Sequence, residues 1–202
     1  MKIGLVPMAA KPYHAGHHAL VEKAARENDR VKLFISVTDR ARPGEITIRG
    51  EDMVNVWQNH LEGILPSNVT PLYVRVPVRE VYEELTAAES QQDEAVTYMV
   101  YSDPEDTAAN YPEQNRTKYF PELYASGNIQ FAAECDPPGC TRGIGTPDIS
   151  GTKMRDHLLA GDFDSFAANM PAGVDSKAIY DILRGDAAIR EYVQVVWAGG
   201  LG

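Results

Sequence analysis

Two histidines flank a glycine close to the start of the chain, in the sequence His14-Ala-Gly16-His17. An apolar run, residues 3–8, comes before this sequence and a helical pattern follows it. Glycine at a strand-to-helix turn lets a ligand approach the backbone, and a helix N-terminus presents N–H groups and a positive dipole end to an anion. Imidazoles at such a turn donate hydrogen bonds to phosphate oxygens. The spacing predicts a phosphate-binding turn, whereas His18, one residue further round the helix, is expected only to pack.

A second set of phosphate-binding residue types lies more than 130 residues later, in Ile149-Ser-Gly-Thr-Lys-Met-Arg155. Ser150 and Thr152 offer hydroxyl groups at a predicted helix start, and Arg155 lies one turn further on, where its guanidinium can grip phosphate oxygens in pairs. Lys153 adds positive charge to the same segment. Taken alone, this pattern is also that of an ordinary helix cap, so it is the pairing with the histidine turn that indicates a ligand site.

Together the two segments resemble the paired signatures of the nucleotidylyltransferase superfamily, His-x-Gly-His and Ile-Ser-x-Thr-x-x-Arg. Members have a Rossmann-like parallel sheet of the cytidylyltransferase-like fold. They transfer a nucleoside monophosphate from a nucleoside triphosphate to an anionic acceptor and release pyrophosphate. The Pro-aromatic-His form of the first signature is more similar to the nicotinamide-mononucleotide and FMN adenylyltransferases than to the cytidylyltransferases. The cytidylyltransferases usually carry Asp where this chain has Lys11. The resemblance covers residues 1–160.

The resemblance implies roles for individual residues. Catalysis would fall to His14, His17, Lys11 and Arg155, which stabilise charge on the α-phosphate and the departing pyrophosphate. Nucleotide and phosphate binding would use Pro7, Met8, Gly16, Ser150, Thr152 and Lys153. Mg²⁺ would arrive with the nucleoside triphosphate, and no metal site on the protein itself is expected. Because a phosphate oxygen of the acceptor is already a nucleophile, the chemistry is mostly in-line positioning and charge stabilisation.

We therefore expect an adenylyltransferase that uses ATP and a phosphorylated small molecule such as nicotinamide mononucleotide. Three alternatives stay open. A cytidylyltransferase would use CTP and a phosphorylated alcohol or sugar, and a silent sensor would bind the nucleotide without turnover. A relative of class I aminoacyl-tRNA synthetases or pantothenate synthetase would share the histidine turn. Such a relative needs a Lys-Met-Ser-Lys-Ser-like loop, where this chain has Ser-Gly-Thr-Lys-Met-Arg.

The elements that must position these residues alternate along the chain. Strands are predicted at 3–8, 31–37, 72–76, 95–101 and 129–133, and helices at 17–28, 51–64, 78–90 and 111–126, the last interrupted at Pro121. Helices alone follow, at 152–160, 163–169, 175–184 and from 186 toward 197. This order predicts an α/β fold: a Rossmann-like parallel five-stranded sheet with helices on both faces and a helical C-terminal portion. We expect one domain across residues 1–202, with an α/β core at 1–150 and the helical portion at 151–202.

Weaker candidates lie in loops after the predicted strands. Arg40 and Arg42 are placed to bind the phosphate of the acceptor, and Asp103 to contact the acceptor or its ribose. Arg49 is a further candidate for binding the phosphate of the acceptor, and Arg142, on the approach to the second signature, is a candidate for closing over phosphates. Cys135 and Cys140 are expected to be two reduced thiols in a turn, since a disulfide framework needs more cysteines.

Charge is distributed unevenly over the 202 residues. The formal net charge is −10, yet residues 1–50 contain nine lysines and arginines against five acids. An acidic whole argues against a nucleic-acid or membrane-surface partner, because either needs a broad basic face. No apolar run approaches the length of a membrane helix. We expect a cytoplasmic protein whose partners are small anionic molecules, and a homo-oligomer is left open.

Overall fold

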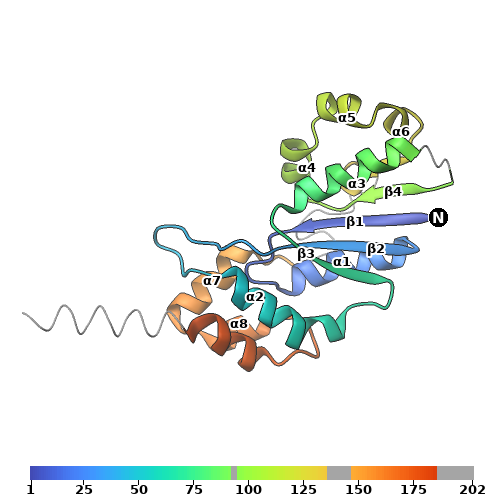
Figure 1. The fold of residues 1–202 in the computed structure, drawn as a ribbon. Helices are drawn as coiled ribbons and strands as arrows, with labels where there is room; N and C mark the ends of the chain where they lie inside the picture. Colours follow the sequence, from blue (N-terminus) through green and yellow to red (C-terminus); the bar gives the residue numbers. More distant parts are fainter. Residues whose placement is uncertain (92–94, 136–146, 186–202) are drawn as a thin grey trace, which may run out of the picture. The chain divides into compact units, whose positions relative to one another are not determined.

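The computed structural model describes residues 1–91, 95–135 and 147–185, which are drawn in colour in Figure 1. The chain divides into two units. Unit 1 comprises Met1–Ala10, Gly16–Ser36 and Leu65–Asp148, and unit 2 comprises Lys11–Ala15, Val37–Ile64 and Ile149–Gly202. Each unit thus gathers segments that are distant in the sequence. The single domain predicted for 1–202, with its division near residue 150, stays a prediction.

The described part of unit 1 contains a five-stranded sheet in which every pairing is parallel. Its strands are β1 (Lys2–Met8), β2 (Arg30–Ser36), β3 (Val69–Val74), β4 (Thr97–Val100) and β5 (Ile129–Phe131), in the spatial order β3-β2-β1-β4-β5. The predicted parallel five-stranded α/β fold is confirmed. Strand order reverses between β1 and β4, and ligands of such sheets bind outside the carboxyl ends of the strands at this position.

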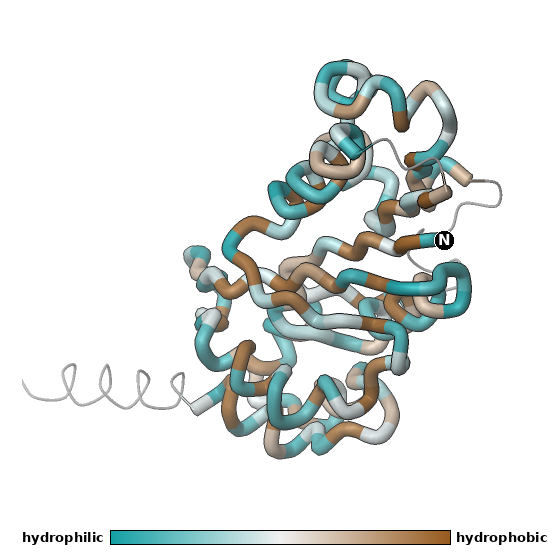
Figure 2. The backbone as a smooth tube through the Cα atoms, turned by 45° about the vertical axis from the view of Figure 1, so that its right-hand side comes forward, coloured by the Kyte–Doolittle hydropathy of each residue, from teal (hydrophilic) through white to brown (hydrophobic). Residues whose placement is uncertain are grey.

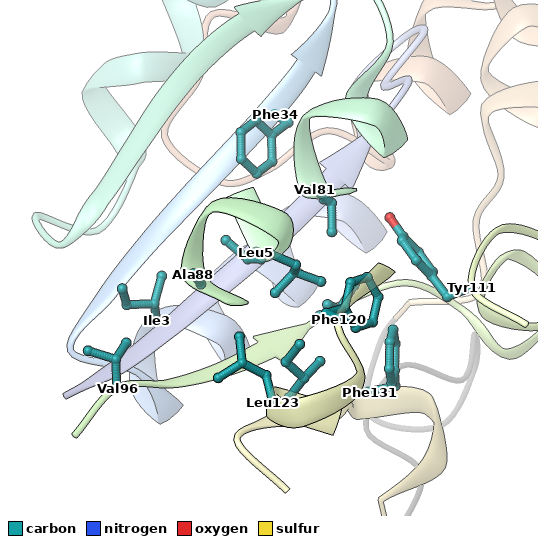
Figure 3. Packing of buried hydrophobic residues seen from close by; sticks show 13 residues of the cluster. Ile3, Leu5, Phe34, Val81, Ala88, Val96, Tyr111, Phe120, Leu123 and Phe131 are labelled. Atoms are coloured by element: carbon teal, nitrogen blue, oxygen red, sulfur yellow. The ribbon is translucent and has the colours of Figure 1, made fainter. Parts of the chain in front are cut away.

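Helices flank both faces of this sheet. On one face, Val81 and Leu85 of α3 (Pro77–Gln91) pack with Ile3 and Leu5 of β1 in one buried cluster (Figure 3). Side chains alternate along a strand, so Gly4 points to the other face. A Cβ on Gly4 would lie 3.0 Å from the Asn28 side chain, and Asn28 directly follows α1 (Ala15–Glu27). Helix α1 therefore covers the second face, as predicted.

Aromatic rings close the far side of the α3 cluster. The rings of Tyr111, Phe120 and Phe131 lie together there (Figure 3), and the Tyr111 and Phe131 centroids are 5.5 Å apart. The surrounding short helices are α4 (Pro104–Asn110), α5 (Glu113–Tyr119) and α6 (Pro121–Ala125). Hydrophobic segments of the strands are interrupted by hydrophilic residues, and the helices alternate between the two kinds of residue (Figure 2). Burial of the apolar helix faces against the sheet is the main favourable contribution to the stability of this unit.

The described part of unit 2 is largely helical. Helix α2 (Gly50–Val56) continues without a break into a π-helical turn, η1 (Trp57–Leu61), and a 3₁₀ turn, η2 (Glu62–Ile64). Helices α7 (Gly151–Ala160) and α8 (Phe163–Ala168) follow, and residues 176–185 are helical as well. These helices agree with the prediction for 51–64 and for the described part of 151–202. The helix predicted from 186 onward, together with Cys140 and Arg142, lies outside the described residues.

Some predicted boundaries are wrong. Strand β3 runs over Val69–Val74 instead of 72–76. Strands β4 and β5 are shorter than predicted, and β5 gives way to a 3₁₀ turn at Ala132–Glu134. Helix α4 was not predicted at all. Each difference lies outside the two signature segments.

Candidate functional site

The turn that follows β1 is buried in unit 2. Lys11 and His14 are only 5% and 4% exposed, and Tyr13 is fully buried against Trp57, with ring centroids 4.5 Å apart. The turn is also held through its backbone, because Ala15 N donates to the carbonyl of Asn169 at 2.9 Å. Packing therefore fixes the segment that carries the first half of the predicted phosphate turn.

Lys11 is an ionisable group of this turn whose pKa is changed by its surroundings. Burial lowers its pKa from 10.5 to about 8, and the Asp39 carboxylate opposes this shift only in part. A buried ammonium loses hydration that an anionic ligand can replace. At pH values near 8, Lys11 is thus poised to gain a proton when an anion binds beside it.

Helix α7 begins as the second signature predicts. Ser150 is the N-cap, and its hydroxyl accepts a hydrogen bond from Lys153 N at 3.2 Å. Met154 and Leu158 are fully buried, whereas Thr152 and Lys153 are exposed. The helix ends at Gly161, whose φ of 74° suits glycine. The apolar face thus anchors the helix and leaves its first turn facing outward.

Arg155 connects α7 with the turn at Lys11. Its Nη1 donates to the carbonyl of Lys11 at 2.7 Å, across 144 residues of sequence, and its Nη2 donates to Thr152 Oγ1 at 3.0 Å. Gly151 allows this approach, since a Cβ there would lie 3.1 Å from Arg155 Nη1. Unit 2 by itself therefore brings together Lys11 of the first signature segment and Arg155 of the second.

The loop between β2 and α2 contributes an acid to the same place. Glu45 Oε2 lies 3.0 Å from Arg155 Nε and 3.1 Å from Arg40 Nε. Hydrogen bonding from Arg40 is the largest cause that lowers the pKa of Glu45, and Arg155 adds to it. In this structure the Arg155 guanidinium, which the sequence assigned to phosphate, donates to protein acceptors.

Two residues at the base of this loop hold its ends together. Gly50 N donates to Asp39 Oδ1 at 2.8 Å, and a Cβ on Gly50 would lie only 1.7 Å from the carbonyl oxygen of Val37. Only glycine fits such a close approach of two backbone segments. Sequence reasoning missed Gly50, Asp39 and Glu45. The signal for Glu45 was its position as an acid between arginines in a basic loop, a pattern typical of ion pairs.

The remaining residues of the first signature belong to unit 1. Gly16 and His17 lie in the first turn of α1, and Pro7 and Met8 are the last two residues of β1. His18 Nε2 lies 3.7 Å from Glu22 Oε1, and burial lowers the pKa of the His18 imidazole. This placement agrees with a packing role for His18, and the phosphate roles of His14, His17 and Gly16 stay predictions.

The acceptor candidates have partners within the protein. Arg40 pairs with Glu45, and its backbone exchanges hydrogen bonds with Ile48 at 2.8 and 3.0 Å. Arg42 is exposed. Asp103 is the N-cap of α4 and accepts a hydrogen bond from Asp106 N at 2.8 Å. Arg49 lies 3.0 Å from Glu51. Their contacts with an acceptor stay predictions.

Across residues 1–91, 95–135 and 147–185, no group of three or more His, Cys, Asp or Glu side chains is placed to hold a metal ion. In the same ranges, every helix is too short or too polar to span a bilayer.

The parallel sheet and the meeting of the two signature segments in unit 2 agree with the nucleotidyltransferase-like α/β fold that the signatures indicate. Residues 3–71, which include β1, the histidine turn, β2 and α2, match the family model described as citrate lyase ligase C-terminal domain. That family belongs to the nucleotidyltransferase-like, or cytidylyltransferase-like, superfamily. No curated protein matches the chain significantly. The match agrees with the superfamily that the signatures indicate, and it does not single out the nicotinamide-mononucleotide branch.

Proposed function

We propose that the protein is a nucleotidylyltransferase that transfers a nucleoside monophosphate, AMP from ATP, to the phosphate of a small acceptor such as nicotinamide mononucleotide. The observation that carries this proposal is the 2.7 Å hydrogen bond from Arg155 Nη1 to the carbonyl of Lys11. It joins, within unit 2, two segments that are each suited to phosphate and are far apart in sequence. The superfamily of the family match supports the same reaction class.

In the proposed reaction, an oxygen of the acceptor phosphate attacks the α-phosphorus of the nucleoside triphosphate. A new P–O bond forms as the bond between the α-phosphorus and its bridging oxygen breaks, and pyrophosphate leaves with the electron pair. No proton has to be removed from the nucleophile. His14, His17 and Lys11 stabilise charge at the α-phosphate, and Ser150, Thr152, Lys153 and Arg155 bind the β- and γ-phosphates. Mg²⁺ carried by the nucleotide substrate would neutralise charge on the phosphate oxygens.

The position of the second signature supports these roles. Thr152 and Lys153 are exposed at the N-terminus of a ten-residue helix, where backbone N–H groups and the helix dipole favour an anion. Ser150 is half-buried and already oriented by its cap. Polyphosphate oxygens would therefore meet donors from both side chains and backbone.

Pyrophosphate release tests the proposal. The purified chain is incubated with ATP or CTP, Mg²⁺ and a panel of phosphorylated acceptors, and His17→Ala is compared with His18→Ala. Removal of the charge-stabilising imidazole should lower turnover by about 10²–10⁴-fold, whereas the neighbouring packing histidine should change it by less than about threefold. Equal rates for wild type and His17→Ala would refute the assignment, and the preferred nucleotide decides between adenylyl and cytidylyl transfer.

A nucleotide sensor is the second candidate, and one observation favours it. The Glu45 carboxylate already engages both Arg40 and Arg155, so these arginines are not preset for a triphosphate. A sensor would bind nucleotide in a direct binding assay and release no pyrophosphate with any acceptor of the panel.

A further inference from the structure

The Glu45 carboxylate is gripped by two guanidinium groups in unit 2. Arg40 approaches it with Nε at 3.1 Å from Oε2 and Nη2 at 3.2 Å from Oε1. Arg155 donates from Nη2 to Oε1 at 3.4 Å, and its Nε lies 3.0 Å from Oε2 as an ion pair without hydrogen-bond geometry. Arg40 therefore presents its fork to both oxygens, and Arg155 faces the same pair through a looser contact. Such forks match a carboxylate and a phosphate equally well.

Arg155 does not depend on Glu45 for its orientation. It keeps two other acceptors, the carbonyl of Lys11 and the hydroxyl of Thr152, and its side chain is only 5% exposed. Arg40 is fixed through its backbone by the pair of hydrogen bonds with Ile48. The Arg155 guanidinium would therefore stay close to its position if the carboxylate left, and the Arg40 backbone would keep its side chain attached at the same point of the loop.

The Glu45 side chain lies in a turn that can change its conformation at a small cost in free energy. Glu45 follows Gly44, which is exposed and has a φ of 78°, in a turn closed by the hydrogen bond from Glu45 N to the carbonyl of Arg42 at 3.1 Å. Buried Ile46 and Ile48 anchor the loop on the other side. A change of the Glu45 rotamer, with a small shift of the turn, would withdraw the carboxylate and leave the base of the loop in place.

The charges also favour an incoming phosphate. One carboxylate balances only one of the two guanidinium groups, whereas a phosphate group with close to two negative charges balances both. We propose that Arg40 and Arg155 form a phosphate-binding site and that Glu45 occupies it as an internal competitor, which a substrate phosphate displaces. This inference rests on the proposed function and adds a regulation of the same site.

The consequence is a measurable penalty on phosphate affinity. When a binding site is open only part of the time, the apparent dissociation constant rises by the inverse of the open fraction. If the carboxylate occupies the site for about nine tenths of the time, its removal should tighten binding about tenfold. If Glu45 instead positioned the arginines, the same change would weaken binding.

The matched pair of variants is Glu45→Gln and Glu51→Gln. Both remove one negative charge, six residues apart, but Glu51 pairs only with Arg49 among the described contacts and its side chain is 73% exposed. Titration calorimetry measures the dissociation constants of inorganic tripolyphosphate and of ribose 5-phosphate at constant pH and ionic strength. Thermal unfolding checks that each variant is folded. Glu45→Asp, which keeps the charge on a shorter side chain, serves if Glu45→Gln does not fold.

We expect Glu45→Gln to bind at least one of the two probes about tenfold more tightly than wild type, and Glu51→Gln to stay within about twofold. A gain with tripolyphosphate assigns the site to the nucleotide, and a gain with ribose 5-phosphate assigns it to the acceptor. Glu45→Asp should show the same direction with a smaller gain. Equal or weaker binding by the folded Glu45 variants, compared with Glu51→Gln, would overturn the inference. Since the assay measures binding without turnover, failure of the proposed reaction would be seen separately.

Discussion

Lys11 should take up a proton when a nucleotide binds. Its burial lowers the pKa to about 8. At pH 9 only about one tenth of the lysines are then protonated. A polyphosphate beside the amine favours the ammonium form and should return the pKa toward its ordinary value of 10.5, where nearly all of the lysines are protonated at pH 9. Binding at pH 9 should therefore be accompanied by uptake of about 0.9 proton.

Calorimetric titration with ATP at pH 9 measures this uptake. The binding enthalpy is determined in buffers of different ionisation enthalpy, and the slope between the two quantities is the number of protons exchanged. The phosphates of ATP contribute little, because their last ionisation lies near pH 6. At pH 7, where free Lys11 is already about nine tenths protonated, the slope should fall to about one tenth of a proton.

Lys11→Arg is the control, because a guanidinium keeps the positive charge and does not deprotonate in this range. The variant should bind ATP with a slope near zero at pH 9. A zero slope for wild type, with binding still measurable, would show that Lys11 does not contact the anion. An unchanged slope in Lys11→Arg would show that another group takes up the proton, and it would refute the same reasoning.

Three further predictions concern the framework of unit 2. Gly50→Ala places a Cβ 1.7 Å from the carbonyl oxygen of Val37, so the free energy of unfolding should fall by about 3 kcal/mol, measured by urea denaturation; an unchanged midpoint would contradict the close approach. Ser150→Ala removes the N-cap of α7 and should cost about 1 kcal/mol in the same assay, with no loss expected if the cap is not formed. Arg155→Met removes the buried hydrogen bond to the Lys11 carbonyl and should cost about 1.5–3 kcal/mol, whereas a stable variant would show that the bond contributes nothing.

The strands and most helices could be predicted because their buried residues form regular apolar patterns in the sequence. Strand β1 is a continuous apolar run covered on both faces, and α3 has a regular apolar stripe that meets it. Strand β3 was misplaced because Pro71 lies inside it. Proline usually argues against a strand, but β3 is at the edge of the sheet and has a neighbour on one side only.

Helix α4 was not predicted because it lacks an apolar pattern. Its only buried residue is Thr107, so no apolar stripe reveals it. The start signal was present, since Asp103 is an N-cap and Pro104 occupies the first turn. The prediction gave Asp103 to the acceptor, whereas its carboxylate is used at least in part to cap this helix. Polar caps and polar ligand contacts use the same residue types, so sequence alone separates them poorly.

The same ambiguity decides what the second signature means. Sequence predicts that Ser150 and Arg155 suit phosphate, and the structure shows that each already has a protein partner: Lys153 N for the serine, and the Lys11 carbonyl and Glu45 for the arginine. These partners are compatible with ligand binding, because they have different roles. The bonds to Lys11 and Thr152 position the guanidinium, while the bond to Glu45 blocks one edge of it. Arg155 is held in place by the Lys11 carbonyl and the Thr152 hydroxyl, and the Glu45 carboxylate covers one edge of it. Replacement of this carboxylate by a phosphate group is therefore the one change that the proposed site needs in order to bind its ligand.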